Sequence, residues 1–467
     1  MSCKESALKA RTASIPLGAL KDDQKNRALQ AIRSSLRSNR QAIFEANRKD
    51  LERSEKEKLS TPLLKRLKFD EIKLNEVCAG IESLIQLPDP IGRVMSAREL
   101  DTKLELYQVS CPIGVIGVIF ESRPDALVQI SSLCLKSGNA VLLKGGREAL
   151  ETNRALFRII EKASTQEGIP RGWISLLETR EDVKELLQLD SLVDLIIPRG
   201  SNEFVRYIMR HSSIPVLGHA DGVCHLYVDE GADLEMALTL TIDAKTQYPS
   251  VCNAIETLLI HRSMASQFLP RLVQVFGANP PERASEAAVA GVETRVQGAR
   301  NQSSSKLSPE APVPWVELRG CPETRKIIPC KTATEEDWKA EYLDYILAVK
   351  VVGSLEEAVN HINTYGSRHT DSIVTPSRER AEFFMERVDS ANVFWNTSTR
   401  FSDGYRYGLG AEVGISTGKL HARGPVGLEG LTTYKWRLYG HGHIVAAYTG
   451  KSPKPFTHRP LPNRLAE

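Results

Sequence analysis

The feature that most constrains the fold of this chain is a regular alternation of apolar runs and helical patterns that begins near residue 114. The apolar run 114–120 precedes a helical pattern over 124–136, and a second apolar run follows at 140–144. Two strands joined through a helix form a βαβ unit, in which the strands lie parallel. The alternation continues with helices over 150–162, over 183–187 and after Gly200, and with strands over 174–178 and 193–197. The sequence therefore predicts a doubly wound α/β domain.

Helices are expected before this domain, and a second α/β domain is expected after it. Apolar residues recur at helical spacing from 22 to 47, which predicts an amphipathic helix, and helical patterns continue to residue 87. Further strands are expected at 104–110, 224–228, 347–352 and 372–375, with a helix at 355–363. Since domains usually span about 100–200 residues, we expect two or three of them.

Two segments carry little apolar periodicity. Residues 279–314 are rich in Ala, Glu, Ser, Pro and Gly, so we predict a mobile insertion there. Residues 441–467 are rich in Gly, Pro, His and basic side chains, so we predict a flexible tail.

Composition excludes several classes of function. The formal net charge is +3, with 61 basic and 58 acidic residues interspersed, so no nucleic-acid partner is indicated and a small anionic metabolite stays possible. The eight cysteines include no C-x-x-C pair, which argues against structural zinc and a disulfide framework. No segment has the apolar length of a signal peptide or a membrane span. We therefore predict a cytoplasmic protein with reduced thiols and no membrane contact.

Two loops of the first domain have the properties of a nucleotide site. Lys144 leaves a strand and is followed by two glycines and Arg147, while Gly200 and Ser201 end a strand and open a helix. Helix N-termini at the carboxyl ends of parallel strands bind phosphate through unpaired N–H groups. Each loop alone is equally compatible with a capped tight turn, but the two together favour a nucleotide.

The common nucleotide fingerprints are missing. The strand turns lack G-x-G-x-x-G, and the nearest sequence, at 408–414, has one residue too many. No Walker A loop occurs either, so ATP-dependent phosphoryl transfer loses support.

Cys252 is the candidate nucleophile. It follows a polar stretch that contains Pro249 and precedes the apolar run 254–260, which is expected to be a strand. A thiol at such a junction is held by the scaffold and can still be reached. The local sequence alone favours the other interpretation, a small buried apolar residue.

The order of the Lys144 loop, the Gly200 loop, Cys252 and Glu341 resembles that of the aldehyde dehydrogenase superfamily, whose cofactor domain lacks the usual fingerprint. Many stretches resemble its γ-glutamyl phosphate reductase branch, over about residues 10–434. They are Phe-Glu-Ser-Arg-Pro at 120–124, Lys-Ser-Gly-Asn at 136–139, Ile-Pro-Arg-Gly-Ser at 197–201, Pro-Val-Leu-Gly-His-Ala-Asp-Gly at 215–222, Asp-Ala-Lys-Thr at 243–246, Cys-Asn-Ala at 252–254, Ser-Arg-His-Thr-Asp at 367–371, Trp-Asn at 395–396, Thr-Arg-Phe at 399–401, Arg-Tyr-Gly at 406–408, Gly-Ala-Glu-Val-Gly-Ile-Ser at 410–416 and His-Ala-Arg-Gly-Pro-Val-Gly at 421–427.

The resemblance implies an aldehyde dehydrogenase-like α/β fold and a reaction. Its parts would be a Rossmann-like NADP-binding domain (1–98, 112–223 and 390–422), an α/β catalytic domain (224–389) and an oligomerisation hairpin (99–111 with 423–440).

The implied reaction is NADPH-dependent reduction of L-glutamyl 5-phosphate to L-glutamate 5-semialdehyde and phosphate, in L-proline biosynthesis. A homo-oligomer is expected. The kinase domain of bifunctional relatives is missing, so we expect a separate glutamate 5-kinase to supply the substrate.

The resemblance also implies the catalytic roles. Cys252 would form a thioester with the substrate, and Ser122 falls near the asparagine that stabilises the oxyanion in the wider superfamily. Lys245 could lower the pKa of Cys252 or could equally be a solvated surface lysine. No glutamate stands in 217–222, where hydrolytic relatives activate water, and this absence fits a reductase. No metal is implied.

The remaining implied roles concern the cofactor and the substrate. Glu341 resembles the glutamate that holds the nicotinamide ribose, and Lys144 would contact the adenosine ribose or a 2′-phosphate. Further cofactor residues are Gly200, Ser201 and Arg147, where Arg147 either favours NADP or is an exposed arginine at the start of a helix. For the substrate, Arg123 is expected to bind the phosphate and Ser398 with Arg400 the amino-acid end, because a guanidinium binds both groups bidentately.

Two other hypotheses stay open. The chain could be a binding or regulatory protein that keeps the nucleotide fold without turnover, although the presence of both Cys252 and Glu341 argues against it. It could also be an ordinary aldehyde dehydrogenase that oxidises free aldehydes. Dependence of turnover on phosphate distinguishes that enzyme from the reductase.

Overall fold

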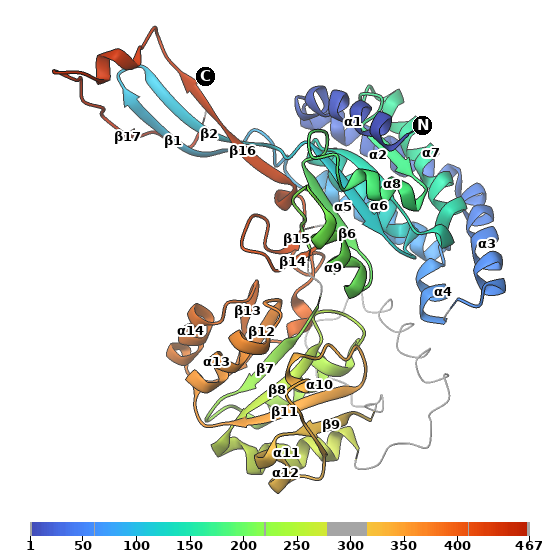
Figure 1. The fold of residues 1–467 in the computed structure, drawn as a ribbon, viewed down its shortest axis with the longest axis vertical. Coiled ribbons are helices and arrows are strands. Elements are labelled where there is room, and N and C mark those ends of the chain that lie inside the picture. The colour runs from blue at the N-terminus through green and yellow to red at the C-terminus, as the bar shows by residue number, and fades with distance from the viewer. Residues whose placement is uncertain (1, 60, 219–220, 278–314, 410, 465–467) are drawn as a thin grey trace. The chain divides into compact units, whose positions relative to one another are not determined.

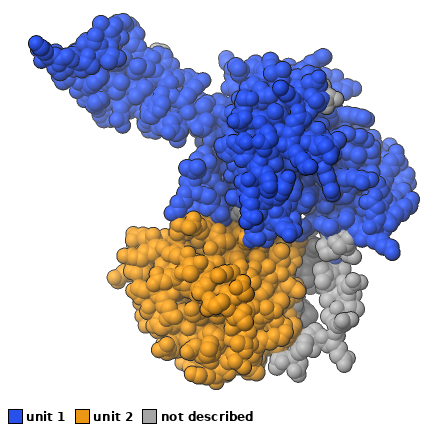
Figure 2. Space-filling view, viewed as in Figure 1, with its two compact units in different colours: residues 1–220, 403–467 blue, residues 221–402 orange. Residues whose placement is uncertain are grey.

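The structure is a computed structural model, and it describes residues 2–59, 61–218, 221–277, 315–409 and 411–464 (Figure 1). The predicted insertion at 279–314 lies outside these described residues. The chain forms two compact units, residues 1–220 with 403–467 and residues 221–402 (Figure 2). Each unit contains a parallel sheet and helices, so the predicted α/β class is confirmed.

The main sheet of the first unit has four parallel strands in the order β5-β4-β3-β6. The strands are β3 (Val115–Phe120), β4 (Ala140–Lys144), β5 (Ile174–Leu177) and β6 (Leu195–Arg199). Every residue of β3 and β4 is buried, which explains why their sequences are almost uninterrupted apolar runs. The predicted strand–helix–strand alternation is confirmed.

Helices pack around this sheet (Figure 1). They are α1 (Cys3–Gly18), α2 (Asp22–Ser38), α3 (Arg40–Lys56), α4 (Thr61–Leu67), α5 (Glu71–Gln86), α6 (Pro124–Lys136), α7 (Leu150–Gln166), α8 (Arg180–Leu186) and α9 (Asn202–His211). The single helix predicted over 22–47 is two helices, because Asn39 leaves the helical conformation and donates from its side chain to the Ser35 carbonyl at 2.8 Å. Within the described part of the chain, no helix has the length and apolarity needed to cross a membrane.

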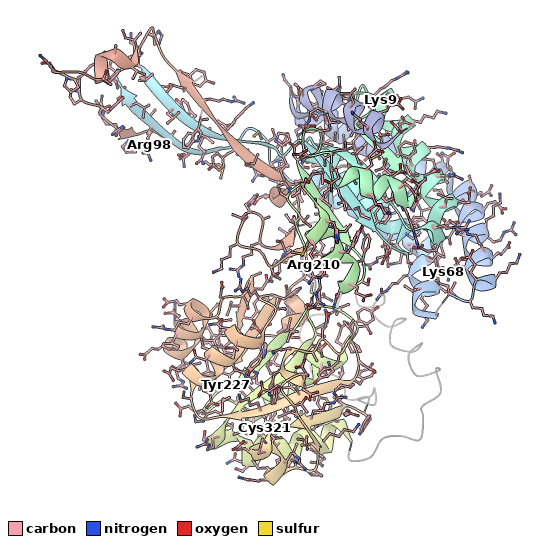
Figure 3. All side chains as sticks on the ribbon, in the orientation of Figure 1. Lys9, Lys68, Arg98, Arg210, Tyr227 and Cys321 are labelled. Atoms are coloured by element: carbon pink, nitrogen blue, oxygen red, sulfur yellow. The ribbon has the colours of Figure 1, made fainter. Side chains whose placement is uncertain are left out.

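An arm of four strands, in the order β16-β2-β1-β17, extends from the first unit (Figure 1). The strands are β1 (Val94–Asp101), β2 (Leu104–Pro112), β16 (Thr432–Tyr439) and β17 (Arg459–Pro460). The pair β2 and β16 joins the two segments assigned to a hairpin from the sequence. Strand β1 was not predicted, because it carries exposed Arg98 (Figure 3) and little apolar alternation. A separate antiparallel pair is β14 (Gly414–Ser416) with β15 (Gly424–Val426).

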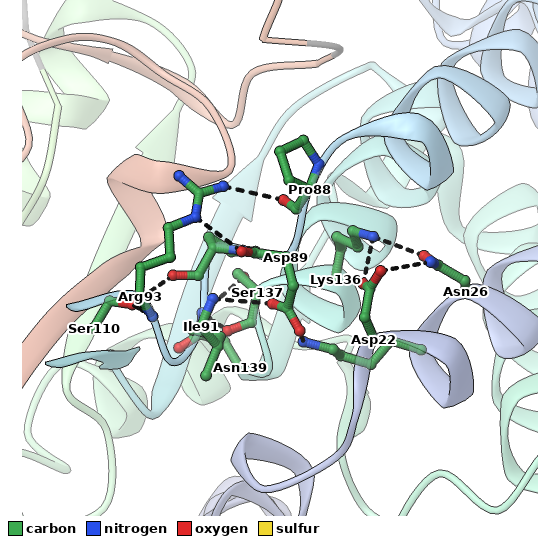
Figure 4. Close-up of polar contacts among 12 residues, drawn as sticks. Asp22, Asn26, Pro88, Asp89, Ile91, Arg93, Ser110, Lys136, Ser137 and Asn139 are labelled. Carbon is green, nitrogen blue, oxygen red and sulfur yellow. Dashed lines mark hydrogen bonds and ion pairs between the residues drawn. The ribbon is translucent and has the colours of Figure 1, made fainter. Parts of the chain in front are cut away.

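The base of the arm is held by a polar network (Figure 4). Arg93 donates to the carbonyl oxygens of Asp89 at 2.9 Å and Pro88 at 3.2 Å, and its backbone N–H donates to the Ser110 hydroxyl at 2.9 Å. The Asp89 carboxylate in turn pairs with the buried Lys25 ammonium of α2 at 2.6 Å. The start of β1 is therefore tied both to β2 and to the helical layer.

The tail, which was predicted to be flexible, contacts the arm. Its described part does not stand apart from the fold, because β17 pairs with β1 and the Arg459 guanidinium pairs with Glu99 at 2.8 Å. Asp101 accepts a hydrogen bond from the Tyr448 hydroxyl at 2.7 Å and pairs with Lys454, and both contacts lower the pKa of Asp101 to about 2. All these contacts join residues that are more than 300 positions apart, which local composition could not indicate.

The second unit is built on one seven-stranded parallel sheet, in the order β10-β9-β11-β8-β7-β12-β13. Its strands are β7 (Cys224–Val228), β8 (Ile255–His261), β9 (Glu317–Gly320), β10 (Lys331–Thr332), β11 (Ile346–Val352), β12 (Thr370–Val374) and β13 (Asn392–Trp395), and its helices are α10 (Leu234–Thr246), α11 (Arg262–Phe276), α12 (Pro322–Ile327), α13 (Leu355–Tyr365) and α14 (Arg378–Arg387). Residues 390–402 were assigned to the NADP-binding domain, but they belong here because β13 pairs with β12.

Deleting residues 442–467 is expected to speed amide hydrogen exchange across residues 94–101 by at least about tenfold, because the outer edge of β1 loses its paired strand and becomes exposed to water. Hydrogen–deuterium exchange read by mass spectrometry checks this, with the buried strand β3 as the internal control. Unchanged protection of residues 94–101 would show that the tail does not cover that edge.

Candidate active site

Cys252 lies in a tight turn immediately before β8. The N–H of Ala254 donates to the carbonyl oxygen of Val251 at 3.0 Å, so Cys252 occupies a central position of the turn. Its side chain is half-buried, whereas Cys134 and Cys224 are fully buried and burial raises the pKa of both thiols. Cys252 is therefore more accessible than these two thiols.

The segment that leads into β7 passes directly against this turn. A Cβ atom placed on Gly222 would lie 2.3 Å from the Cys252 carbonyl oxygen and 2.6 Å from the Cys252 Cβ. Gly222 is therefore required for close approach of two backbones. The thiol of Cys224, two residues further on, donates to the same carbonyl oxygen at 3.1 Å. Two neighbouring parallel strands thus hold the backbone of Cys252 at their amino-terminal edge.

The residues after Cys252 are held from the other side by the 3₁₀ helix η5 (Thr399–Phe401). The Asn253 side chain donates to the Ser402 carbonyl at 2.7 Å, and the Thr399 hydroxyl donates to the Asn253 carbonyl at 2.7 Å. Asn253 and Thr399 were not singled out from the sequence as site residues. Only their contacts in the folded chain show that both side chains hold the residue after Cys252 in place.

The structure brings the predicted substrate residues of η5 to the same loop. The Arg400 Nε donates to the Gln247 side-chain oxygen at 2.9 Å, which orients a guanidinium that is almost fully buried. Ser398 is the N-cap of η5, and its hydroxyl accepts from the Arg400 N–H at 3.3 Å. Ser398, Arg400 and Cys252 therefore belong to one cluster of the second unit.

A reversal of the chain after β13 delivers η5 to this position. Asn396 has a φ of 53°, and its side-chain amide binds both the N–H and the carbonyl of Thr375, each at 3.0 Å. Asparagine tolerates this left-handed conformation better than most residues. The chain then runs back along β12, where the Ser372 hydroxyl donates to the Thr397 carbonyl at 2.7 Å.

Lys245 is a buried residue of the site. Its ammonium lies 2.5 Å from the Glu256 carboxylate, and both side chains are completely buried. The alternative of a solvated surface lysine is therefore wrong. Burial lowers the pKa of Lys245 and raises that of Glu256 to about 7, while the attraction within the pair opposes both shifts. Glu256 was not identified from the sequence, where it stands inside an apolar strand.

The segment that carries Glu341 lies beside the Cys252 loop. The Leu343 N–H donates to Glu256 at 3.2 Å, and the Leu343 carbonyl accepts from the Ser250 hydroxyl at 3.0 Å. Burial is the main cause of the raised pKa of Glu256, and the negative charge of Glu341, two residues before Leu343, adds to it. Glu341 thus joins the cluster of the second unit.

In the first unit, the predicted cofactor residues lie at the carboxyl-terminal edge of the sheet. Lys144 ends β4 and is almost fully buried, and its ammonium donates to the Gly145 carbonyl at 2.6 Å. Burial lowers the pKa of Lys144, while the nearby Glu148 opposes this shift. Arg147 follows on the surface.

Ser122 lies two residues after the neighbouring strand β3, and both of its hydrogen-bond donors are engaged. Its N–H and its hydroxyl both donate to one oxygen of Glu148, at 2.6 and 2.8 Å. Its φ of 48° is unusual for a serine, and the two bonds to Glu148 hold it there. Arg123, the next residue, is exposed and precedes α6.

Gly200 and Ser201 lie where the strand order of the first sheet reverses. The order β5-β4-β3-β6 places this switch point between β3 and β6, the usual place for a ligand in such sheets. A Cβ on Gly200 would come within 2.8 Å of the Glu121 carboxylate, and Ser201 caps α9 by accepting from the Phe204 N–H at 3.4 Å. The N-terminus of α9 and the buried Lys144 ammonium are groups of the kind that bind the phosphates and ribose of a dinucleotide.

Comparison with known proteins shows the family of the chain. The aldehyde dehydrogenase family profile matches residues 11–300. The chain is 59% identical over 461 residues to the gamma-glutamyl phosphate reductase of Pelotomaculum thermopropionicum, covering 99% of this chain and 98% of that protein. The chain belongs to the γ-glutamyl phosphate reductase branch of the aldehyde dehydrogenase family. It is therefore an oxidoreductase, and the predicted family is confirmed.

Solved structures of this family have the same fold. The gamma-glutamyl phosphate reductase of Thermotoga maritima is 38% identical, with a TM-score of 0.84, and the match covers 95% of this chain and all of that one. An engineered glycolyl-CoA reductase with bound NADP+ is 15% identical, with a TM-score of 0.61 and coverage of 94% of this chain and 96% of that one. The second likeness concerns the fold alone.

Replacing Gly222 by Ala is expected to lower kcat at least about 100-fold, because the added methyl group displaces the Cys252 backbone and misplacement of a reacting group by about 1 Å has effects of that size. Steady-state kinetics and thermal unfolding check this. Gly80→Ala, in α5, is the matched control for an added methyl group, since Gly80 lies in a helix and no atom beyond the neighbouring backbone lies within 4 Å of its Cβ. Wild-type kcat in Gly222→Ala would contradict the close approach.

Proposed function

We propose that this protein reduces L-glutamyl 5-phosphate with NADPH to L-glutamate 5-semialdehyde and phosphate, in L-proline biosynthesis from glutamate. The observation that carries the proposal is the Cys252 turn, in which the backbone that bears a half-buried thiol is held between Gly222 and η5, the helix that contains Arg400. The relatives and the Thermotoga structure, all gamma-glutamyl phosphate reductases, support the choice of reaction.

The proposed chemistry begins at the Cys252 sulfur. The thiolate attacks the acyl carbon of the substrate, a C–S bond forms, and the C–O bond to phosphate breaks to leave a thioester and inorganic phosphate. NADPH, when bound, supplies the hydride that reduces this thioester to a thiohemiacetal. Cys252 then departs as a thiolate when the thiohemiacetal collapses to the aldehyde, so the thiol ends the cycle as it began.

Two groups are proposed to stabilise the oxyanion. The backbone N–H of Cys252 is one donor, because the turn holds it in a fixed direction. Ser122 is our second candidate, and in that role its hydroxyl would exchange its bond to Glu148 for one to the substrate. The absence of a glutamate in residues 217–222 removes the usual activator of water, which preserves the thioester for hydride transfer.

Three polar residues are proposed to hold the substrate. Arg400, with Ser398 beside it, binds the α-carboxylate, and the hydrogen bond from its Nε to Gln247 orients the guanidinium for a bidentate contact. Arg123 is proposed to bind the phosphate. Its exposure on the first unit leaves the guanidinium accessible to an anion.

The cofactor residues are proposed from both clusters. Glu341 holds the nicotinamide ribose through carboxylate–hydroxyl hydrogen bonds, and Lys144 holds the adenosine ribose or its 2′-phosphate. Gly200 and Ser201 present the N-terminus of α9 to the pyrophosphate. Arg147 adds a positive charge near Lys144 and favours NADPH over NADH.

The setting of the reaction follows from its chemistry. A separate glutamate 5-kinase must form the acyl phosphate, and we place both enzymes in the cytoplasm. The arm, whose strand β16 presents Tyr434, Trp436 and Leu438 on its exposed surface, is proposed to join copies of this chain into a homo-oligomer.

Replacing Cys252 by Ala is expected to abolish turnover and to leave NADPH affinity within about twofold, because the thiol takes part in chemistry and not in holding the cofactor. The assay is the reverse reaction, reduction of NADP by glutamate semialdehyde and phosphate. Cys330→Ala is the matched control, since Cys330 is also a half-buried thiol of the second unit. Activity retained by Cys252→Ala would refute the thioester route, and turnover without phosphate would identify an ordinary aldehyde dehydrogenase.

Replacing Arg147 by Ala is expected to raise the KM for NADPH about tenfold and to change the KM for NADH less than about twofold. Loss of one charge-assisted contact worth about 1.5 kcal/mol accounts for the difference. Arg158→Ala, which removes an exposed arginine of α7, is the control. Equal changes for the two cofactors would exclude Arg147 as the source of the preference.

A further inference from the structure

The loop that carries Cys252 lies between Lys245 and Glu256, and these two residues form an ion pair that joins its two ends. Lys245 stands in the last turn of α10, and Glu256 is the second residue of β8, so the ten residues between them form the loop. The ammonium and the carboxylate are 2.5 Å apart and completely buried. The ends of the loop are thus joined by a charged contact that water does not reach.

The other oxygen of Glu256 extends this contact to a second segment. It accepts from the Leu343 N–H at 3.2 Å, and the Leu343 carbonyl accepts from the Ser250 hydroxyl at 3.0 Å. Both polar groups of the Leu343 backbone are therefore bound by the Cys252 loop and its closing pair. Leu343 has a φ of 56°, a conformation that a branched side chain adopts only when its surroundings hold it.

Lys245 also faces the residue between Glu341 and Leu343. Its ammonium lies 5.9 Å from the centre of the Tyr342 ring, and the Arg319 guanidinium lies 5.1 Å from the same ring. The Tyr342 hydroxyl donates to the Asp337 carboxylate at 2.8 Å. The ring is thus fixed by two cations and one acceptor, with Lys245 linking it to the Cys252 loop.

A buried ion pair is a costly way to hold two segments together, because both charges must leave water. Well-packed apolar residues of similar size often give equal or greater stability. Stability alone therefore does not account for charges at this position. An apolar pair would lack the carboxylate oxygen of Glu256 that accepts a hydrogen bond from the Leu343 N–H.

We propose that Lys245 and Glu256 are positioning residues that fix the Glu341 segment against the Cys252 turn through the backbone of Leu343. This inference rests on the proposed function, in which Glu341 holds the nicotinamide ribose and Cys252 carries the thioester. The pair sets the separation of these two groups, and hydride transfer depends on that separation. It acts through the backbone and does not touch the reacting atoms.

Two double variants separate a positioning role from a structural one. K245M/E256L removes both charges and the acceptor, whereas K245M/E256Q removes both charges but keeps a side-chain oxygen for the Leu343 N–H. Neither leaves an unpaired buried charge, so we expect both to fold, as checked by circular dichroism and thermal unfolding. We expect kcat to fall about 100-fold in K245M/E256L and less than about tenfold in K245M/E256Q.

An ion pair of the same unit, between buried Asp229 and half-buried Arg380, supplies the control. Asp229 pairs with the Arg380 guanidinium at 2.6 Å and accepts from the Tyr227 hydroxyl (Tyr227 is labelled in Figure 3), at the carboxyl-terminal end of β7. Cys252 lies at the amino-terminal end of the parallel strand β8. D229N/R380M is therefore expected to keep kcat within about threefold, because the change lies at the opposite edge of the sheet.

The rate at which iodoacetamide alkylates Cys252 is measured on the same variants, since it needs no substrate. We expect at least about a threefold change in K245M/E256L and wild-type behaviour in D229N/R380M. Wild-type kcat and alkylation in a folded K245M/E256L variant would overturn the inference, and so would equal losses in the two K245M variants. If the wild-type protein fails to turn over glutamate semialdehyde, the proposed function falls, and the alkylation rates decide the positioning role by themselves.

Discussion

In the second unit, the backbone of Gly222 lies so close to the backbone of Cys252 that no side chain fits between them. This contact requires β7 and β8 to be neighbours, parallel and in fixed register, since each residue stands just before one of the two strands. The register in turn places the Cys224 thiol where it donates a hydrogen bond to the Cys252 carbonyl oxygen. The remaining groups of the cluster are arranged around this one immobile turn.

The two units use opposite edges of their sheets. In the first unit, the residues proposed for the cofactor follow the carboxyl ends of β4 and β6, where α9 presents its N-terminus and the strand order reverses. In the second unit, Cys252 precedes its strand, and Leu343 lies shortly before β11. An anionic cofactor benefits from helix dipoles, whereas a nucleophile benefits from a rigid turn, and each edge supplies one of these.

Much of the fold could be predicted from residue patterns, because the information was local. Fully buried strands such as β3 and β4 read as unbroken apolar runs, and α6 was bounded correctly by Pro124 and Lys136. The strands β1 and β17 could not be found in this way, since their pairing depends on contacts with distant residues rather than on their own side chains. The boundary at residue 402 was missed for the same reason.

The sequence by itself determined the α/β class, the family and the identity of the candidate nucleophile, because these depend on residue types in a fixed order. Only the tertiary structure decided which groups surround Cys252. From the sequence, Lys245 could equally have been a surface lysine or a neighbour of the nucleophile, and Glu256 was not singled out; only the folded chain brings the two side chains to 2.5 Å from each other. Likewise, Arg400 reaches the Cys252 loop only because the chain reverses at Asn396. Such contacts depend on the path of the backbone through space, which no local pattern of residues records.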